Sequence, residues 1–243
     1  MKVSFIMQTY LGEYPGSRSD STFKFHRAVK SFIDQTDKES ELIIVSDGCN
    51  IVHQEYFSNY KDNDRIKYVF VDKDTPNMYE GEKKYYRGLP RQVGRSLVTG
   101  EITTYMDSDD YLLNDAVESI KKHWNAFPPN SIVCIYNSSW IDNQVMFDRE
   151  DLMSKSNICV GNPFKIEGLD SLWINRKMTH ETLILSSTWS MTHRSDFEGK
   201  WEDTIGEPSE DVAFSLKLQK TKKVAVMNEP YYVRCHYSNL WDY

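Results

Sequence analysis

Short apolar segments recur along the first part of the chain and are separated by longer amphipathic ones. The short segments are rich in β-branched or aromatic residues, and several are apolar at consecutive positions, as in strands that are covered on both faces. The predicted strands are Val3–Gln8, Leu42–Ser46, Lys67–Val71, Ile102–Met106 and Ile132–Tyr136.

Helices are predicted between several of these strands. Phe25–Asp34, Pro90–Val98 and Asn114–Phe127 carry apolar side chains three or four positions apart, which places those side chains on one face of a helix. The alternation predicts an α/β fold, with a doubly wound, mainly parallel central sheet and helices on both of its faces. In such folds, ligands bind at the carboxyl ends of the strands, near the point where the strand order reverses.

The pattern loosens from about Val145 onward, where the sequence is polar, irregular and rich in aromatic residues. Two interpretations fit the tryptophans in and beside this region. They form a platform for the apolar faces of sugar rings, or they belong to the core, where tryptophan is usually well buried. The residues concerned are Trp140, Trp173, Trp189 and Trp201.

The composition argues against several classes of protein. The chain has 243 residues, enough for one large domain, and its 36 acidic and 29 basic residues give a net charge of -7. A nucleic-acid partner, which needs a broad basic face, is therefore not expected. The apolar stretch at the N-terminus is too short for a secretory signal, and the longest apolar run, Ile132–Tyr136, cannot span a bilayer. We therefore expect a soluble, cytoplasmic chain without a transmembrane segment.

Familiar cofactor and metal motifs are missing from the sequence. The four cysteines show no C-x-x-C spacing, which argues against a structural zinc site and predicts reduced thiols. No Gly-x-Gly-x-x-Gly follows the first predicted strand, and Gly-x-x-x-x-Gly-Lys-Ser/Thr does not occur. Dinucleotide-dependent oxidoreductases and P-loop ATPases are both disfavoured for this reason.

The most distinctive segment is acidic and follows the predicted strand Ile102–Met106. Three carboxylates occupy four positions there, and they repel one another unless a cation is bound. In an extended chain Asp107 and Asp109 point the same way, so both can reach one ion, and their hard oxygen atoms favour Mg2+ or Mn2+. The alternative is a solvated turn before a helix that starts at Asn114, where acidic residues favour the helix dipole.

A second acidic pair opens a predicted helix near the C-terminus. Val212 to Leu218 have helical spacing, and Ser209 is a preferred N-cap residue that puts Glu210 and Asp211 in the first turn. Capping alone accounts for two acids at this place. Whether one of them faces the first acidic segment is left open by the pattern.

Seven short segments follow one another in a distinctive order. They are Val3–Tyr10, Ser31–Thr36, Glu41–Gly48, Gly88–Gly94, Met106–Asp110, Glu210–Asp211 and Tyr232–His236. Each is weak evidence alone, but in this order, over nearly the full length, they resemble the inverting nucleotide-sugar glycosyltransferases of family 2, which have the GT-A fold. The resemblance implies one GT-A domain over 1–243, with a nucleotide-sugar-binding half at 1–110 and an acceptor-binding half, including a small acceptor-side region, at 111–243.

The resemblance also implies donor-site roles for particular residues. Thr9 and Asp47 would hold the base of the donor, with Asp47 accepting the imide hydrogen of uracil. Arg91 would lie beside the base or the diphosphate. Asp107 would meet the ribose, and Asp109 would bind an Mn2+ or Mg2+ ion that bridges the diphosphate. Tyr10 and Ser108 complete the nucleotide-sugar-binding set.

On the acceptor side, the resemblance implies that Asp211 is the general base. It would take the proton of an acceptor hydroxyl as that oxygen attacks C1 from the face opposite the leaving group, which inverts the configuration. Glu210 either orients Asp211 or caps the helix. His236 is either a structural histidine or a group that completes the metal shell or contacts the diphosphate.

Two loops admit two interpretations. Leu11–Thr22 is longer than the usual passage from the first strand to the first helix, and either forms a lid over the donor or contacts a partner subunit. Lys83, Lys84 and Arg87 form a basic stretch that could meet the diphosphate. Because Glu80 and Glu82 interleave it, a solvated charge run is the favoured interpretation.

These observations predict a metal-dependent inverting glycosyltransferase of the hexosyl or N-acetylhexosaminyl type. Its donor would be a nucleoside-diphosphate sugar, preferably a UDP-sugar, and its acceptor a hydroxyl of a saccharide or glycolipid in polysaccharide biosynthesis. Such an acceptor would allow a peripheral position at the inner face of the membrane. A sugar nucleotidyltransferase and a non-catalytic carbohydrate-binding protein of the same fold are the alternatives.

Overall fold

The computed structural model describes most of the N-terminal half and shorter parts of the C-terminal half. The described residues are 1–13, 20–72, 79–80, 83–126, 131–135, 138–139, 158–159, 191–205, 209–221, 223–227 and 231–233.

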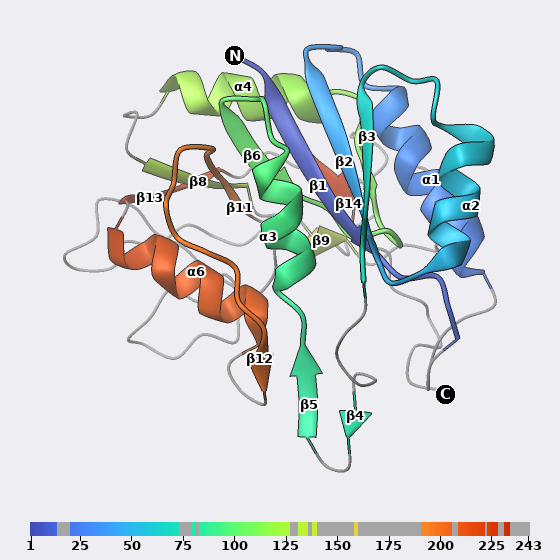
Figure 1. Cartoon of the computed structure of the whole chain (residues 1–243). Helices are drawn as coiled ribbons and strands as arrows, with labels where there is room; N and C mark the ends of the chain where they lie inside the picture. The colour runs from blue at the N-terminus through green and yellow to red at the C-terminus, as the bar shows by residue number, and fades with distance from the viewer. Residues whose placement is uncertain are drawn as a thin grey trace.

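A seven-stranded sheet forms the centre of the molecule, in the order β13-β8-β11-β6-β1-β2-β3 (Figure 1). All of its strands are parallel except β11, which is antiparallel to both of its neighbours. The strands are β1 (Val3–Thr9), β2 (Ser40–Asp47), β3 (Ile66–Val71), β6 (Ile102–Tyr105), β8 (Ser131–Ile135), β11 (Met191–Arg194) and β13 (Lys223–Met227). The mainly parallel sheet that the sequence predicts is therefore confirmed.

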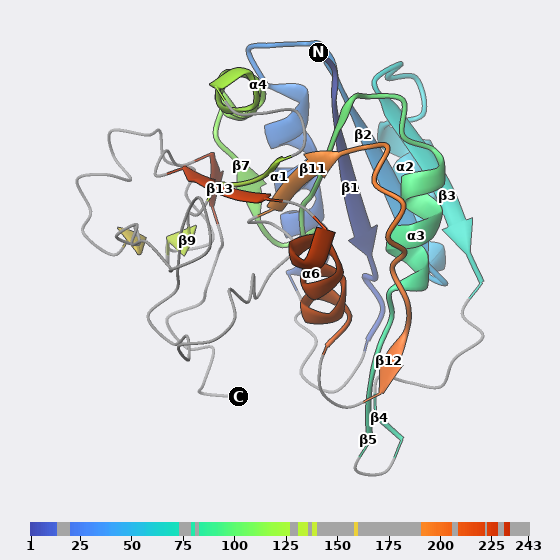
Figure 2. The same cartoon turned by 90° about the vertical axis from the view of Figure 1, so that its left-hand side faces the viewer.

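Five helices among the described residues cover the two faces of this sheet. They are α1 (Ser21–Ile33), α2 (Asn50–Asn59), α3 (Leu89–Ser96), α4 (Ala116–Ala126) and α6 (Glu210–Thr221). Apolar residues of α1, α2 and α4 share one core cluster, and those of α6 and the end of α3 share the other. Figure 2 shows α1 and α4 on one side of β1 and α3 on the other.

The alternation of side chains along β1 explains why there are two core clusters. Val3, Phe5 and Met7 point to the face covered by α1 and α4, whereas Ile6 points to the face covered by α3 and α6. Both sets are almost completely buried. A strand that is apolar on both faces needs cover on both, which is the reason for helices on each side.

Three smaller sheets complete the described part of the fold. β4 (Tyr79–Glu80), β5 (Lys83–Tyr86) and β12 (Thr204–Ile205) form one, and β7 (Tyr111–Leu112) pairs with β14 (Tyr232–Val233) in another. β9 (Ser138–Ser139) pairs with β10 (Ile158–Cys159). No helix in the described ranges has the length and the apolar composition that a membrane crossing requires.

The structure adds elements that the sequence pattern did not predict, among them helix α2 and two strands of the central sheet, β11 and β13. Helix α2 buries only Val52 and Tyr56, so it lacks the apolar stripe that marks a helix. Strand β11 lies in the stretch interpreted as irregular, because its buried Thr192 and His193 are polar. The predicted helices are found with their ends shifted by a few residues, which is the usual uncertainty of such boundaries.

Candidate functional site

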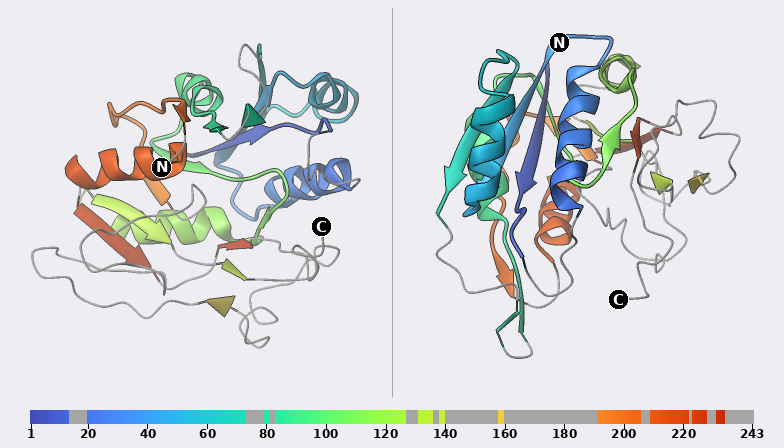
Figure 3. Two further views of the ribbon diagram at one scale, coloured as in Figure 1. Left: turned by 90° about the horizontal axis from the view of Figure 1, so that it is seen from below. Right: turned by 90° about the vertical axis from the view of Figure 1, so that its right-hand side faces the viewer.

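The predicted donor-side residues meet at one edge of the sheet. Strand β1 pairs with β2 on one side and with β6 on the other, and the carboxyl ends of these parallel strands lie together. The left panel of Figure 3 looks towards this edge. Thr9 ends β1, Asp47 ends β2, and Asp107 follows β6 by two residues. The reversal of strand order at β1 is the place where α/β folds bind ligands.

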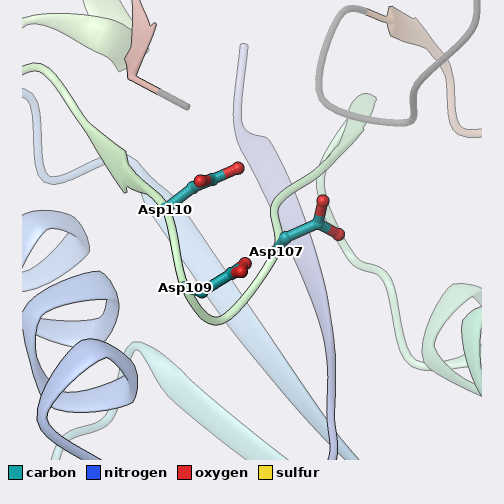
Figure 4. A group of neighbouring side chains, drawn as sticks. All are labelled: Asp107, Asp109 and Asp110. Carbon is teal, nitrogen blue, oxygen red and sulfur yellow. The ribbon is translucent and has the colours of Figure 1, made fainter. Parts of the chain in front are cut away.

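The acidic segment forms a compact turn (Figure 4). A carboxylate oxygen from each of Asp107, Asp109 and Asp110 lies within 4.8 Å of the others. The expected convergence of Asp107 and Asp109 is therefore present, but the extended geometry assumed for it is wrong. Ser108 and Asp109 lie in a turn, and the Asp110 amide approaches the Asp107 carbonyl at 3.4 Å. Three hard oxygen donors at this spacing suit a divalent cation such as Mg2+ or Mn2+.

Neighbouring elements hold this turn from two sides. Arg27 of α1, which is buried, donates from a terminal guanidinium nitrogen to the Asp109 carbonyl at 2.5 Å and lies over the Tyr111 ring. On the other side, the Tyr232 hydroxyl donates to Asp110 at 2.8 Å and accepts from the Asp107 amide at 2.9 Å. The sequence pattern pointed to neither Arg27 nor Tyr232 as part of the site.

Asp47, at the end of β2, forms a hydrogen-bonded group with Gln8 and Arg87, called here the Asp47 group. Arg87 donates to its Oδ1 at 2.5 Å, and Gln8 donates to its Oδ2 at 3.1 Å. The Asp47 and Arg87 side chains are only 10% and 9% exposed. The interpretation of the stretch around Arg87 as a solvated charge run is therefore wrong for Arg87, because its guanidinium turns inward to an acid far away in sequence.

The chain around Asp47 is shaped by its neighbours. Gly48 has a φ of 65°, a left-handed conformation that glycine adopts readily, and it turns the chain out of β2. Thr9 is buried at the end of β1, with its hydroxyl 3.5 Å from the Met7 carbonyl. Tyr10 is partly buried against the core cluster of β1 and α1. Both residues lie at the carboxyl end of β1, and their role in donor binding stays a prediction.

Arg91 of α3 connects the two acidic segments. It donates to Glu210 Oε1 at 2.5 Å, forms an ion pair with Asp107 at 3.7 Å, and lies over the Trp201 ring. Burial acts to lower the pKa of Arg91, but the charges of Glu210, Asp107 and Asp211 outweigh it and raise that pKa. The guanidinium is thus a fixed positive charge between the acidic turn and the start of α6.

A glycine brings Arg91 close to the sheet. A Cβ atom on Gly94, one helical turn after Arg91, would lie 2.7 Å from the Ile6 side chain and 2.9 Å from the Val45 side chain. A side chain at this position would push α3 away from β1 and β2. The absence of one allows α3, and Arg91 with it, to approach the carboxyl edge.

The first turn of α6 carries the second acidic pair, as predicted. The Ser209 hydroxyl donates to Asp211, and the Ala213 amide donates to the Ser209 carbonyl. Glu210 turns instead to Arg91, so the two acids have different partners. The question left open by the sequence is answered in part, because Arg91 joins Glu210 to the acidic turn.

Trp201 belongs to the core and not to an exposed platform. It is 2% exposed, stacks on Phe214 of α6 at 4.1 Å, and donates to the Tyr105 hydroxyl at 2.9 Å. Tyr105 also contacts His193 of β11 at 2.9 Å. Burial and the nearby Arg95 charge lower the pKa of His193 to about 3, and burial raises the pKa of Tyr105 to about 12. This network therefore stays neutral near pH 7.

Several predicted residues cannot be placed. His236 and the neighbouring Arg234 lie outside the described residues, as do Trp140, Trp173 and Trp189. The part of Leu11–Thr22 between residues 14 and 19 also lies outside them, so neither interpretation of that loop is tested.

Comparisons with known proteins agree with this architecture. No family model matches the chain. The sequence is 22% identical over 211 residues to the glycosyltransferase GlyA of Streptococcus pneumoniae, a match that covers 85% of this chain and 28% of GlyA. The chain therefore spans less than a third of that relative.

The fold is similar to that of TarS from S. aureus. The crystal structure of TarS 1-349 superposes with a TM-score of 0.62 at 16% identity, covering 97% of this chain and 60% of TarS 1-349. The complexes of the same TarS fragment with UDP-GlcNAc and with UDP give TM-scores of 0.62 and 0.60, both at 17% identity. They cover 98% and 99% of this chain, and 59% and 62% of the TarS chain. The expected GT-A type of α/β fold is thereby confirmed.

Proposed function

We propose that this chain is a metal-dependent inverting glycosyltransferase that moves a sugar from a UDP-sugar to a hydroxyl group. One observation carries the proposal. The acidic turn after β6 and the Asp47 group at the end of β2 lie at the same edge of the sheet, on either side of β1, and Arg91 links the turn to the first turn of α6. A diphosphate at the turn would have the Asp47 group on one side and an acid, Asp211, on the other. The similarity to GlyA and to the fold of TarS supports the same reaction class.

The Asp47 group, which consists of Asp47, Gln8 and Arg87, would bind the base of the donor. Asp47 would accept the imide hydrogen of uracil, with Thr9 and Tyr10 beside it. Among the described residues, the buried Arg87 Nε and Gln8 Oε1 atoms have no hydrogen-bond partner. Buried polar atoms are rarely left unpaired. A bound base offers carbonyl and N–H groups, which would supply hydrogen-bond partners for these two atoms. Arg87 therefore joins the proposed donor set.

The acidic turn would hold the metal. Asp109 is exposed and Asp107 is 38% exposed, so both can reach a cation from the solvent side of the turn. Mn2+ or Mg2+ would there supply the positive charge that a diphosphate needs as it departs. Ser108 lies in the same turn. A role for His236 in the metal shell stays a prediction, but β14 ends at Val233 opposite Tyr111, one residue beyond the acidic turn.

Asp211 would be the general base. Its carboxylate would take the proton of the acceptor hydroxyl, whose oxygen forms the new bond to C1 while the bond from C1 to the diphosphate oxygen breaks. Attack from the opposite face inverts the anomeric configuration. Glu210 is a poorer candidate because its carboxylate is engaged by Arg91 at 2.5 Å. Arg91 would hold the acceptor side in place relative to the donor side.

The remaining assignments follow from the same scheme. Residues 1–110 would bind the nucleotide sugar, and 111–243 would contribute the acceptor side within one domain. TarS was crystallised with UDP-GlcNAc, which makes an N-acetylhexosamine the first sugar to test, with hexoses next. A saccharide or glycolipid acceptor in polysaccharide biosynthesis, and a cytoplasmic position near the membrane that carries it, complete the proposal.

Calorimetry with UDP tests the donor and metal assignments. We expect UDP to bind in the presence of Mn2+ and to bind far more weakly with a chelator, because the three carboxylates would otherwise repel the diphosphate. Equal UDP affinity under both conditions would remove the metal role. Nucleotide binding without any sugar transfer across a panel of UDP-sugars and acceptors would favour the non-catalytic alternative. Formation of a nucleotide sugar from UTP and a sugar phosphate would favour the nucleotidyltransferase.

Substitution of Asp211 tests the base. We expect Asp211→Asn to leave melting temperature and UDP binding unchanged while lowering turnover by a factor on the order of 100 to 10,000, the usual contribution of a positioned base. The product of the wild-type enzyme should have the anomeric configuration opposite to that of the donor. A retained configuration, or near-normal turnover of the variant, would contradict the assignment and make Glu210 the next residue to examine.

A further inference from the structure

We propose that Asp110 is not a metal ligand but a positioning residue, which acts with the Tyr232 hydroxyl to fix the shape of the turn that presents Asp107 and Asp109. The inference rests on the proposed metal site and divides the three clustered carboxylates into two roles. Asp107 and Asp109 would hold the cation, and Asp110 holds the turn.

The contacts of Tyr232 carry this division. Its hydroxyl donates to Asp110 Oδ2 at 2.8 Å and accepts from the Asp107 main-chain amide at 2.9 Å. One side-chain group thus joins the first and the last acid of the turn. Tyr232 is itself fixed, because β14 pairs with β7 in the register Tyr232 to Leu112 and Val233 to Tyr111. These two hydrogen bonds of the Tyr232 hydroxyl, called here the clamp, therefore connect the turn to a strand from near the end of the sequence.

Burial separates the three acids in the same way. Asp110 is 2% exposed and Tyr232 is fully buried, whereas Asp109 is exposed and the Asp107 side chain is 38% exposed. A buried carboxylate needs hydrogen-bond donors of its own, and Tyr232 is one for Asp110. An exposed carboxylate can exchange water for a cation at little cost. Figure 4 shows the three side chains on the short turn between β6 and β7.

The protonation of Tyr232 is consistent with the clamp. Burial raises the pKa of its hydroxyl, and the charges of Asp110 and Asp107 raise it further, well above the ordinary value. A tyrosine hydroxyl carries its proton near pH 7 in any case, so the hydrogen bond to Asp110 does not depend on this shift. Substitution of residues that orient metal ligands through hydrogen bonds, without contacting the metal, commonly lowers metal affinity by about 10-fold to 100-fold.

Tyr232→Phe is the decisive variant because it changes no charge and removes a single oxygen atom. We expect it to weaken Mn2+ binding in the presence of saturating UDP by about tenfold, measured by the loss of the free Mn2+ signal in electron paramagnetic resonance. If Asp110 were a ligand, loss of the Tyr232 hydrogen bond would leave Asp110 freer to bind, and Mn2+ affinity would stay the same or rise. That result would overturn the inference.

Tyr60→Phe is a matched control. The Tyr60 hydroxyl contacts His26 at 2.5 Å, between α1 and α2, and no hydrogen bond within the described residues joins it to the turn. It too loses one tyrosine oxygen atom and the hydrogen bonding of that atom, without any change of charge. Unchanged Mn2+ affinity in Tyr60→Phe, beside a tenfold loss in Tyr232→Phe, supports the clamp. Equal losses in the two variants would mean a general loosening of the fold and would contradict it.

Substitutions of the acids give a second, independent measurement. Asp110→Asn keeps an oxygen that can accept from Tyr232, so it should retain at least tenfold more Mn2+ affinity than Asp109→Asn, which loses a ligand. Tyr232→Phe should lower Mn2+ affinity by a smaller factor in the Asp110→Asn background than in the wild type, because the two groups act through one contact. Equal losses in the Asp109 and Asp110 variants would overturn the inference. A wild-type protein that binds no Mn2+ with UDP would instead overturn the proposed function beneath it.

Discussion

Glu41, at the start of β2, offers the sharpest test of the energetics of the fold. Its carboxylate is 2% exposed and lies at the end of the sheet opposite the candidate site. Oε1 accepts from the Ser4 hydroxyl and the Thr99 amide at 2.6 Å each, and Oε2 accepts from Thr99, Lys67 and Lys2 at 2.8 to 3.0 Å. Glu41→Gln removes the charge and keeps the shape.

The pKa of Glu41 gives the size of the effect. Burial acts to raise this pKa, but the hydrogen bonds from Ser4, Thr99 and Lys67 outweigh it and lower the pKa from 4.5 to about 2. At about 1.4 kcal/mol for each pH unit, the ionised group adds roughly 3 kcal/mol to the free energy of unfolding. Because the folded-state pKa is the lower one, this stabilisation is complete above pH 4.5. It disappears as the pH falls from about 4.5 to about 2.

Urea unfolding followed by circular dichroism measures this contribution directly. We expect Glu41→Gln to lose roughly 3 kcal/mol at pH 7, with the difference from the wild type shrinking steadily below about pH 4.5. The matched control is Glu39→Gln, two residues earlier, whose side chain is 60% exposed and bonded to Lys121. It should lose far less stability than Glu41→Gln, because an exposed ion pair is screened by solvent and contributes little. A Glu41 effect that is equal at pH 7 and pH 3, or no larger than the control, would refute the reasoning.

Three further variants probe the candidate site. Asp109→Asn should weaken Mn2+-dependent UDP binding far more than Asp211→Asn, and calorimetry showing equal losses would contradict the separation of metal and base. Arg87→Lys keeps a charge beside the buried acid of the Asp47 group but loses the Nε–H group, so UDP affinity should fall about tenfold with little change in melting temperature. Glu210→Gln should lower turnover about 10-fold to 100-fold while Mn2+ and UDP binding persist, because Arg91 loses its partner on the acceptor side; normal turnover would limit Glu210 to a capping role.

Much of the proposed donor site, at the carboxyl edge of the sheet, could be predicted from local patterns. Thr9, Asp47 and Asp107 each end or closely follow an apolar strand, and parallel strands bring their carboxyl ends together whatever the detailed geometry. The start of α6 could also be predicted, because Ser209 is followed by two acidic residues and then by apolar residues at helical spacing. These features depend on periodicity and sequence position alone.

The missing parts depend on contacts between distant segments. Arg87 was interpreted as solvated because its sequence neighbours are charged, yet it pairs with Asp47, 40 residues away. Tyr232 reaches Asp110 across 122 residues, and no pattern within β14 indicates that contact. The buried position of Arg27 could not be predicted either, since an arginine within an amphipathic helix usually points to solvent. Tertiary structure decided all three.

The antiparallel strand β11 has a consequence for how the molecule is assembled. In the described sheet, β11 alone joins β6 to β8, and it comes from residues 191–194, well after both of them in sequence. A chain emerging from the ribosome can assemble β6, β1, β2 and β3 early, but the free edge of β6 stays open until β11 has been synthesised. Until then β6 and β8 present open edges, which invite pairing with other chains. Completion of the sheet is therefore a late, long-range step, and chains truncated before β11 should aggregate.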